Sequence, residues 1–389
     1  MSAPRVAIIR QKYNPSGGAE RFVSRAIQAL QSKGKAELWL LARDWIESPG
    51  IHFVRLAPFY LGRTWRDWSF ARATCRHLAS ASFDLVQSHE RLACCDIYRA
   101  GDGVHREWLQ QRARRFGSLR KLAQALSIHH RYVLRAEGRM FRSPRLECVI
   151  CISEMGREEV RRHYQVPENK LEVIYPGVDV DKFNPEVSAH QRHAIRASLG
   201  IADDAYVLVY AGSGFERKGV EAALRAVAAS GLPCHLLILG RDKRAGRYRE
   251  LALKLGLAGQ AHFVGAKGDV RPHYAAADVF IMPSIYEPFG NANMEAMAMG
   301  LPVITSTKSG AAELVSLAAA GHVCDALDVE AQARAIVALS DPVARATAGR
   351  AARAVAEQHS LPKMIDRLVA LYARILASRQ GNSAILRSP

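Results

Sequence analysis

Short apolar runs alternate with longer segments of helical periodicity along most of this 389-residue sequence. The runs are rich in Val, Ile and Leu and are bounded by polar or turn-forming residues, as buried strands require. Strands separated by helices predict parallel sheets with crossover helices, and therefore an α/β fold of doubly wound domains. The predicted strands are 6–9, 37–41, 52–55, 84–87, 96–99, 148–152, 172–175, 206–211, 235–239, 261–264, 279–283 and 303–305.

The chain is long enough for two domains of ordinary size. Pro176-Gly-Val-Asp179 follows the first series of strands and predicts the connection between the domains. We expect a first domain over residues 1–178, a second over 179–360, and a C-terminal segment, 361–389, with a helix from residue 362 to 376. After residue 313 we expect only helices.

Residues 280–303 contain turn-forming residues together with candidate ligand-binding groups. A short strand is followed by Pro283 and Pro288, which keep the next residues out of regular structure, and a helix then opens at Phe289-Gly290-Asn291. The N–H groups at the start of that helix suit a phosphate, and the carboxylates of Glu287 and Glu295 suit sugar diols. The segment therefore predicts a sugar-nucleotide site, with an ordinary β–α–β turn and two solvated glutamates as the alternative.

Two glycine-rich loops follow predicted strands and open helices. Gly212-Ser-Gly-Phe-Glu-Arg-Lys-Gly219 places Arg217 beside Lys218, and two adjacent cations in such a loop suit a pyrophosphate. The loop departs from the dinucleotide fingerprint Gly-x-Gly-x-x-Gly because residue 217 is Arg. Gly17-Gly18 follows the first strand, where ligands of doubly wound domains collect, although a Gly-Gly turn alone is weak evidence.

Glu287, Glu295 and the following Ala296-Met-Ala-Met-Gly-Leu-Pro-Val303 resemble the donor-site signature of the retaining glycosyltransferases of family 4. The resemblance implies the GT-B fold, in which two Rossmann-like domains face a central cleft and a C-terminal helix returns to the first domain. Within the family, residues 10–18, 212–219 and 239–243 are similar to the lipopolysaccharide-core glucosyltransferases. Glu287-Pro-Phe-Gly290 departs from that subfamily towards the commoner family form.

The resemblance also implies roles for individual residues. Arg217 and Lys218 would stabilise the departing nucleoside diphosphate, so no metal is expected, and Glu287 would bind and orient the donor sugar. Glu295 would bind the ribose, and main-chain groups at Val270 would contact the base. Asp102 and His105 would contact the acceptor or sugar, with a bland turn and a helix start as the alternatives. The remaining donor-binding candidates are Gly17, Gly18, Phe289, Gly290 and Asn291.

The net charge of +17 is concentrated in the first half of the chain. Residues 1–183 contain 31 Lys and Arg against 19 Asp and Glu, and residues 99–145 alone contain 12 against 3. Such a surplus favours a polyanionic partner: nucleic acid, anionic lipid or a phosphorylated glycolipid. No RNA-binding signature accompanies it, so we expect a phosphorylated glycolipid acceptor and an anionic membrane surface rather than nucleic acid. The expected reaction is transfer of glucose from UDP-glucose to the lipopolysaccharide inner core.

Three alternatives remain open at this stage. The first is a GT-B enzyme with another donor, such as GDP-mannose, and another lipid or polysaccharide acceptor. The second is a basic nucleic-acid-binding protein, and the third is an inactive, lectin-like relative. Asp179-Val-Asp181 resembles a metal-binding Asp-x-Asp motif but lies in the linker, so we interpret it as unrelated to metal.

Residues 59–70 are rich in aromatic residues and Arg. Either they form a helix with two tryptophans in the core, or they form an interfacial patch, because Trp and Arg together favour the lipid headgroup zone. The seven cysteines show no framework spacing, so disulfides are not expected, and Cys148 and Cys151 are expected to be buried thiols. No apolar run is long enough to cross a bilayer and the N-terminus does not resemble a signal peptide. We expect a cytoplasmic protein, peripheral on the inner face of the cytoplasmic membrane.

Overall fold

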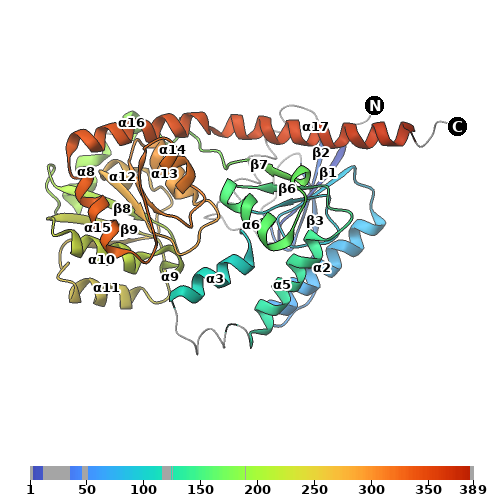
Figure 1. Cartoon of the computed structure of the whole chain (residues 1–389), viewed down its shortest axis with the longest axis horizontal. Helices are drawn as coiled ribbons and strands as arrows, with labels where there is room; N and C mark the ends of the chain where they lie inside the picture. Colours follow the sequence, from blue (N-terminus) through green and yellow to red (C-terminus); the bar gives the residue numbers. More distant parts are fainter. Residues whose placement is uncertain are drawn as a thin grey trace. The chain divides into compact units, whose positions relative to one another are not determined.

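The computed structural model describes residues 3–11, 36–45, 51–115, 124, 126–188 and 190–385, with side chains as far as residue 379. The chain forms two compact units (Figure 1). The first comprises Met1–Tyr175 and Pro362–Pro389, and the second comprises Pro176–Leu361. Each unit is an α/β domain built on a parallel sheet, as the alternation of apolar runs and helical segments predicts.

The first unit contains a seven-stranded parallel sheet in the order β3-β2-β1-β4-β5-β6-β7. The order reverses at β1, which lies between β2 and β4, so this is a topological switch point. The strands are β1 Arg5–Ile9, β2 Glu37–Ala42, β3 His52–Arg55, β4 Leu85–Ser88, β5 Ile97–Arg99, β6 Cys148–Cys151 and β7 Leu171–Val173.

Helices cover both faces of this sheet. Phe70 and Met140, from two of the helices, share a buried core with Val86 of β4. The next residue, Gln87, faces the other way, as strand alternation requires, and accepts a hydrogen bond of 2.7 Å from Tyr372 of the last helix. The helices of this unit are α2 Gly62–Ser80, α3 His105–Arg115, α5 Ile128–Phe141, α6 Glu154–Tyr164, the 3₁₀ turn η1 Glu168–Lys170 and α17 Leu361–Ile385.

The second unit contains a six-stranded parallel sheet in the order β10-β9-β8-β11-β12-β13. Here the order reverses at β8, between β9 and β11. The strands are β8 Tyr206–Ala211, β9 Cys234–Leu239, β10 Ala261–Gly265, β11 Val279–Met282, β12 Val303–Ser306 and β13 Gly321–Cys324. The helices are α7 Pro185–Ser188, α8 Gln191–Ser198, α9 Phe215–Lys218, α10 Val220–Ser230, α11 Ala245–Lys254, α12 Arg271–Ala275, α13 Asn291–Ala298, α14 Ala312–Leu317, α15 Val329–Ala338 and α16 Pro342–Gln358.

Two expectations from the sequence are wrong, and the structure decides against one of the two alternatives for residues 59–70. Gly321–Cys324 is a strand rather than part of a helix; it is a short edge strand with one buried residue, so it leaves no apolar run. Cys75 of α2 and Cys94 of the loop after β4 form a disulfide, because the fold brings their Cα atoms within 5.7 Å. For residues 59–70 the alternative with two tryptophans in the core does not hold: residues from Gly62 onward lie in α2, but Trp65 and Trp68 are 43% and 48% exposed.

Other local predictions are confirmed. Cys148 and Cys151 are buried free thiols on β6, where four consecutive residues are buried. No helix in the described part of the chain is both long and apolar enough to cross a bilayer.

A buried ion pair fixes the amino ends of the two strands that carry the switch-point loops of the second unit. Asp278, just before β11, accepts hydrogen bonds from Val207 N of β8 at 2.8 Å and from Arg196 Nη2 at 3.0 Å. The Arg196 side chain is fully buried and also donates to the main-chain oxygens of Ala276, Ala202, Asp203 and Ala205. All three nitrogen atoms of this guanidinium therefore donate hydrogen bonds that tie α8 to the segments leading into β8 and β11.

Replacement of Arg196 by Met should lower the stability of the second unit by about 3–5 kcal/mol, because Asp278 loses its fully buried partner and keeps, among the described residues, only Arg192 and Val207 N, and several carbonyl oxygens lose their donor. All five tryptophans lie in the first unit, so tryptophan fluorescence follows that unit alone while circular dichroism follows both. In urea titrations, part of the circular dichroism signal of the variant should be lost at a lower urea concentration than in the wild type. The midpoint of the fluorescence transition should be the same in both proteins. Arg225→Met, on the exposed face of α10, is the matched control. An unshifted dichroism transition in the Arg196 variant would show that the pair contributes little.

Candidate active site

The loops after β8 and β11 meet at the switch point of the second unit. Gly219 has φ of +81°, and a Cβ on it would lie 2.0 Å from the main-chain oxygen of Pro283, so only glycine allows this approach. Next to that contact, Ile285 N donates to Arg217 O at 2.8 Å. The two predicted donor segments, 212–219 and 283–291, are therefore packed directly on each other.

One carboxylate joins the cations of the first loop to the second loop. Glu287 Oε2 lies 2.9 Å from Arg217 Nη1 and 3.2 Å from Lys218 Nζ. Arg217 Nη1 also donates to Tyr286 O at 3.0 Å. The Glu287 side chain is only 12% exposed, whereas that of Arg217 is 37% exposed. The arrangement is a buried anion holding two partly accessible cations in place.

The ionisation of Glu287 follows from this geometry. Burial acts to raise its pKa, but the charges of Arg217 and Lys218, with the hydrogen bonds that they donate, outweigh burial and lower the pKa below its ordinary value of 4.5. Glu287 is therefore a carboxylate at neutral pH, an acceptor only, and not a general acid.

The loop after β12 fixes the backbone of Glu287 and its neighbours. Glu287 N donates to Lys308 O at 2.8 Å, and Gly310 N donates to Glu287 O at 3.0 Å. The buried Ser309 donates through Oγ to Phe289 O at 3.1 Å. This supporting role depends on a contact between two loops, so the sequence alone does not indicate it.

Helix α13 begins at the end of the loop after β11. Gly290, with φ of +87°, precedes it, and a Cβ there would lie 2.6 Å from Asn293 Nδ2. Phe289 is buried, while Asn291 and Glu295 are half-buried and one helical turn apart. The structure thus brings Arg217, Lys218, Glu287, the start of α13 and Glu295 into one region of the second unit. Val270 lies elsewhere in this unit, immediately before α12.

The candidates of the first unit lie on the loop after β5. Asp102 is exposed, and its Oδ2 lies 3.5 Å from Nη1 of Arg10, which also lies 3.5 Å from Oε1 of Glu90. These residues follow β1, β4 and β5, at the carboxyl edge near the switch point. Gly17 and Gly18 lie outside the described residues.

His105 is the first residue of α3, and its Nε2 lies 3.1 Å from Nδ1 of His130 on α5. Burial, followed by the charge of Arg91 and the neighbouring histidines, lowers the pKa of His105 to about 3, so its ring is neutral at physiological pH. A neutral imidazole can bind a sugar hydroxyl but supplies no positive charge.

A buried glutamate that the sequence analysis missed organises this loop. Glu137 of α5 accepts hydrogen bonds from His105 N at 3.0 Å, Arg91 Nε at 2.9 Å and Tyr164 OH at 2.6 Å, with its side chain 1% exposed. The acid lies in an Arg-rich helix and resembles a solvated charge in sequence, so only the tertiary fold distinguishes it.

The described residues do not provide a group of side chains that would bind a metal ion. Among the residues that the structure describes, no three His, Cys, Asp or Glu side chains gather as a metal ion would need. Asp179, from the linker motif, accepts a hydrogen bond from Lys182 N within its own turn.

The sequence of the chain matches two known protein families and several known proteins. Residues 16–182 match the family described as Glycosyltransferase Family 4, and residues 191–355 match the family described as Glycosyl transferases group 1. The chain is 26% identical to the lipopolysaccharide glucosyltransferase WaaG of Escherichia coli K12 over 326 residues, or 82% of this chain and 84% of that protein. It is 38% identical over 142 residues to the lipopolysaccharide core biosynthesis glycosyltransferase LpsE of Rhizobium meliloti, or 36% and 41% of the two chains.

Two solved structures have folds similar to that of this chain. A crystal structure of WaaG matches with a TM-score of 0.80 at 24% identity, over 94% of this chain and 99% of that one. Anabaena Alr3699/HepE in complex with UDP-glucose matches with a TM-score of 0.73 at 18% identity, over 95% and 100%. These likenesses confirm the expected fold of two parallel-sheet, Rossmann-like domains of the GT-B type, and the family matches confirm the resemblance.

Replacement of Glu287 by Gln should destabilise the second unit by about 1–3 kcal/mol at pH 7, because an amide cannot balance two adjacent cations. The folded-state pKa of Glu287 lies below its unfolded value, so its stabilising effect is complete above pH 4.5 and is lost as the pH falls through the folded value. The difference between wild type and variant should therefore be constant from pH 8 to 5.5 and shrink below pH 4.5. Urea titrations followed by circular dichroism measure it, with Glu221→Gln as the control. A difference that grew in acid would contradict the assignment.

Replacement of Glu137 by Gln should destabilise the first unit by about 3–5 kcal/mol, because it breaks a buried ion pair with Arg91. Tryptophan fluorescence in urea follows this unit. Glu158→Gln, which removes an exposed partner of Arg161 on α6, should leave the midpoint unchanged. Equal midpoints for the two variants would rule out the organising role of Glu137.

Proposed function

This chain belongs to the group 1 and family 4 glycosyltransferases, and on that premise we propose that it transfers glucose from UDP-glucose to the inner core of lipopolysaccharide, with retention of configuration and without a metal. The observation that carries the proposal is the Glu287 carboxylate shared by Arg217 and Lys218 beside the start of α13. Cations, oriented amides and carboxylates are the groups that a sugar nucleotide requires.

The diphosphate would displace Glu287 from the two cations. Arg217 is 37% exposed while Lys218 and Glu287 are mostly buried, so an incoming phosphate would reach Arg217 first from the solvent side and then Lys218. Glu287 is then free to accept hydrogen bonds from the donor sugar. Binding of the phosphate would thus be coupled to orientation of the sugar. The amides of Phe289, Gly290 and Asn291 add donors for phosphate or sugar, Glu295 accepts from the ribose, and main-chain groups at Val270 contact the base.

In the reaction, the bond between the anomeric carbon and the phosphate oxygen breaks, and the acceptor oxygen bonds to the same face of that carbon. The acceptor proton passes to the departing phosphate. Arg217 and Lys218 stabilise the charge that develops on the diphosphate, which is the contribution a divalent ion makes in other transferases. No enzymic nucleophile is required, which fits a Glu287 that is held by cations rather than poised for attack.

The acceptor assignment rests on relatives and on charge. WaaG and LpsE are both named for lipopolysaccharide, and the first half of the chain holds most of the surplus of Lys and Arg. A phosphorylated glycolipid at an anionic membrane surface would satisfy that charge. Asp102 and His105 would contact the acceptor or the donor sugar. The enzyme would then work in the cytoplasm, peripherally on the inner face of the cytoplasmic membrane.

A donor screen by thermal shift tests the donor site, because a ligand of the folded state raises the melting temperature. UDP-glucose should raise it more than GDP-mannose or ADP-glucose, equally with and without EDTA, and Glu295→Ala should abolish the shift. A shift with GDP-mannose alone would overturn the donor, and loss of activity in EDTA would overturn metal independence.

Transfer to lipid-free core oligosaccharide tests the chemistry. Lys218→Met should lower kcat by about 10²–10³-fold, because one charge on the leaving group is lost. Lys254→Met, at the exposed end of α11, should not. NMR of the product should show the α configuration of the donor; a β product would overturn retention.

A further inference from the structure

The exposed apolar side chains of this protein are concentrated on one part of the first unit. Twelve large hydrophobic side chains are exposed among the described residues, and seven of them lie within residues 59–68 and 126–128. The other five are aliphatic and lie singly in the second unit. We call the concentrated set, with Tyr132 beside it, the aromatic face; its residues are Phe59, Tyr60, Leu61, Trp65, Trp68, Leu126, Ile128 and Tyr132.

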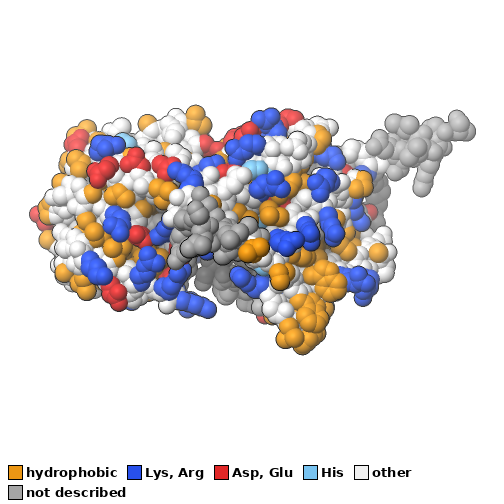
Figure 2. All heavy atoms as spheres, turned by 60° about the horizontal axis from the view of Figure 1, so that its bottom comes forward, with side chains coloured by type: hydrophobic (Ala, Val, Ile, Leu, Met, Phe, Trp, Pro, Cys, Tyr) orange, Lys and Arg blue, Asp and Glu red, His pale blue; other side chains and the backbone are white. Residues whose placement is uncertain are grey.

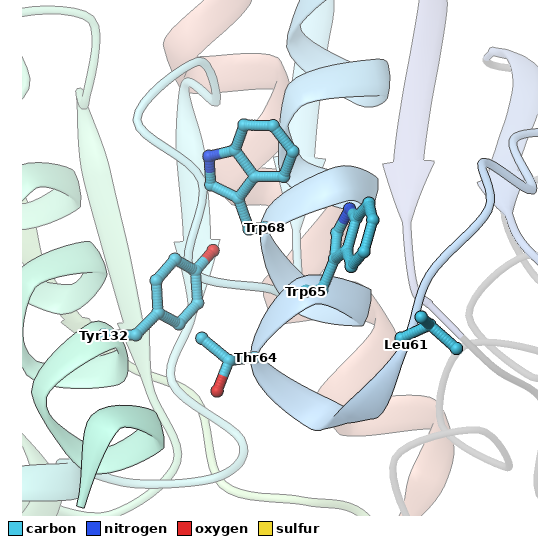
Figure 3. Close-up of a pocket in the computed structure, with 5 residues that line it drawn as sticks. All are labelled: Leu61, Thr64, Trp65, Trp68 and Tyr132. Carbon is cyan, nitrogen blue, oxygen red and sulfur yellow. The ribbon is translucent and has the colours of Figure 1, made fainter.

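Most of the aromatic face is joined into one patch on and around α2, where the Phe59 and Trp65 rings lie 5.7 Å apart. Leu61, Trp65 and Trp68 lie on one side of α2 at helical spacing, and Arg72 follows them one turn on, with its guanidinium 5.8 Å from the Trp68 ring. Figure 3 shows Trp68 opposite Tyr132 of α5, with Thr64 below them. Leu61, Thr64, Trp65, Trp68 and Tyr132 line an open hollow of about 410 Å³.

A buried arginine holds the apolar tip of this face in position. Arg43, 5% exposed, donates to Pro58 O at 2.7 Å, to Arg66 O at 3.0 Å and to Ser69 Oγ at 2.7 Å. Its guanidinium also lies 4.7 Å from the Tyr60 ring. The segment before α2 is therefore anchored to the helix, and the exposure of Phe59, at 71%, is built into the fold.

Exposed arginines lie on both helices that carry the aromatic face, and Asp67 and Glu137 on these helices are paired with arginines. Asp67 lies 2.9 Å from Arg66, and Glu137 is buried against Arg91. On α5, Arg131, Arg135 and Arg139 are exposed at i, i+4 and i+8, along one side of the helix. Figure 2 shows the hydrophobic area at the lower edge of the first unit, with Lys and Arg side chains beside it. The exposed arginines of the two helices are Arg63, Arg72, Arg76, Arg131, Arg135 and Arg139.

We propose that the aromatic face is a membrane-docking surface, which enters the headgroup region of an anionic bilayer while the surrounding arginines bind lipid phosphates. Trp and Tyr prefer the boundary between headgroups and acyl chains, and Arg keeps its charge in the headgroups while its stem covers apolar surface. Leu61, Leu126 and Ile128, 66–75% exposed, add aliphatic groups that a sugar or a nucleic acid does not recognise. An anionic bilayer can accommodate both the apolar side chains and the arginines of this surface.

The inference deepens the proposed function, because it supplies the surface by which an enzyme acting on a glycolipid would reach it. It differs from attraction by net charge in one measurable respect. Charge alone is screened at high salt, whereas insertion of apolar side chains is not.

The test is flotation of the purified full chain with vesicles of phosphatidylethanolamine and phosphatidylglycerol, free of any glycolipid, at 0.1 and 0.5 M NaCl. The wild type should bind at both salt concentrations and should bind pure phosphatidylcholine more weakly. The double variant Trp65→Ser, Trp68→Ser should bind at least about tenfold more weakly at 0.5 M NaCl. The matched control is Leu253→Ser, Leu317→Ser, which removes from the second unit two apolar side chains that are more exposed (65% and 85%) than the two tryptophans. The control should bind like the wild type.

Further readouts separate the possible failures. Both double variants should keep the UDP-glucose thermal shift and transfer to the lipid-free oligosaccharide, so loss of membrane binding is distinguishable from failure of the proposed function. A second face variant, Phe59→Ser with Ile128→Ser, should repeat the binding defect if the tryptophan variant folds poorly. The proposal is overturned if the face variants float like the wild type, if the wild type is released fully at 0.5 M NaCl, or if the face instead mediates a dimer or binds the oligosaccharide alone.

Discussion

Two adjacent cations that face the same way repel each other, and the second unit is built around the anion that holds them. The Glu287 carboxylate reaches Arg217 and Lys218 from the neighbouring loop, at 2.9 and 3.2 Å. That contact is possible because the strand order reverses at β8 and places the ends of β8 and β11 side by side. The close approach of Gly219 to Pro283, where a Cβ would lie 2.0 Å from an oxygen, is the steric counterpart of the same constraint. The ion pairs of Glu287 hold the loops after β8 and β11 together, and these loops position the candidate donor-binding residues.

This constraint makes the site a preorganised one. Cations that are already oriented need no rearrangement when charge develops on a leaving diphosphate, which is why such groups are effective in transfer reactions. The internal carboxylate also offsets the repulsion between two closely spaced cations before the donor binds. The support reaches a second layer, since the loop carrying Ser309 fixes the backbone on either side of Glu287. The buried pair of Arg196 and Asp278 does the same at the other end of the strands.

The sequence predicted what depends on local pattern. All twelve predicted strands overlap observed ones, and their limits agree within one residue except at the end of β7, which stops two residues earlier than predicted. Arg217, Lys218 and Glu287 meet as their motifs indicate. The sequence did not predict features that depend on long-range partners. Glu137 and Arg43 look like solvated charges until the fold buries them. Trp65 and Trp68 follow the helical period of a core stripe, but nothing covers that stripe among the described residues.

The positive charge of the chain, taken alone, does not choose among its possible polyanions. Nucleic acid, lipid headgroups and phosphorylated sugars all attract Arg, so +17 is an argument for attraction and not for identity. The choice comes from the apolar side chains that lie among the charges. A base-stacking platform uses aromatic rings spaced along a groove, without exposed aliphatic residues. Leu61 and Ile128, 67% and 75% exposed, are side chains that only acyl chains or another protein would cover, and the exposed arginines of α2 and α5 favour the anionic bilayer between these two.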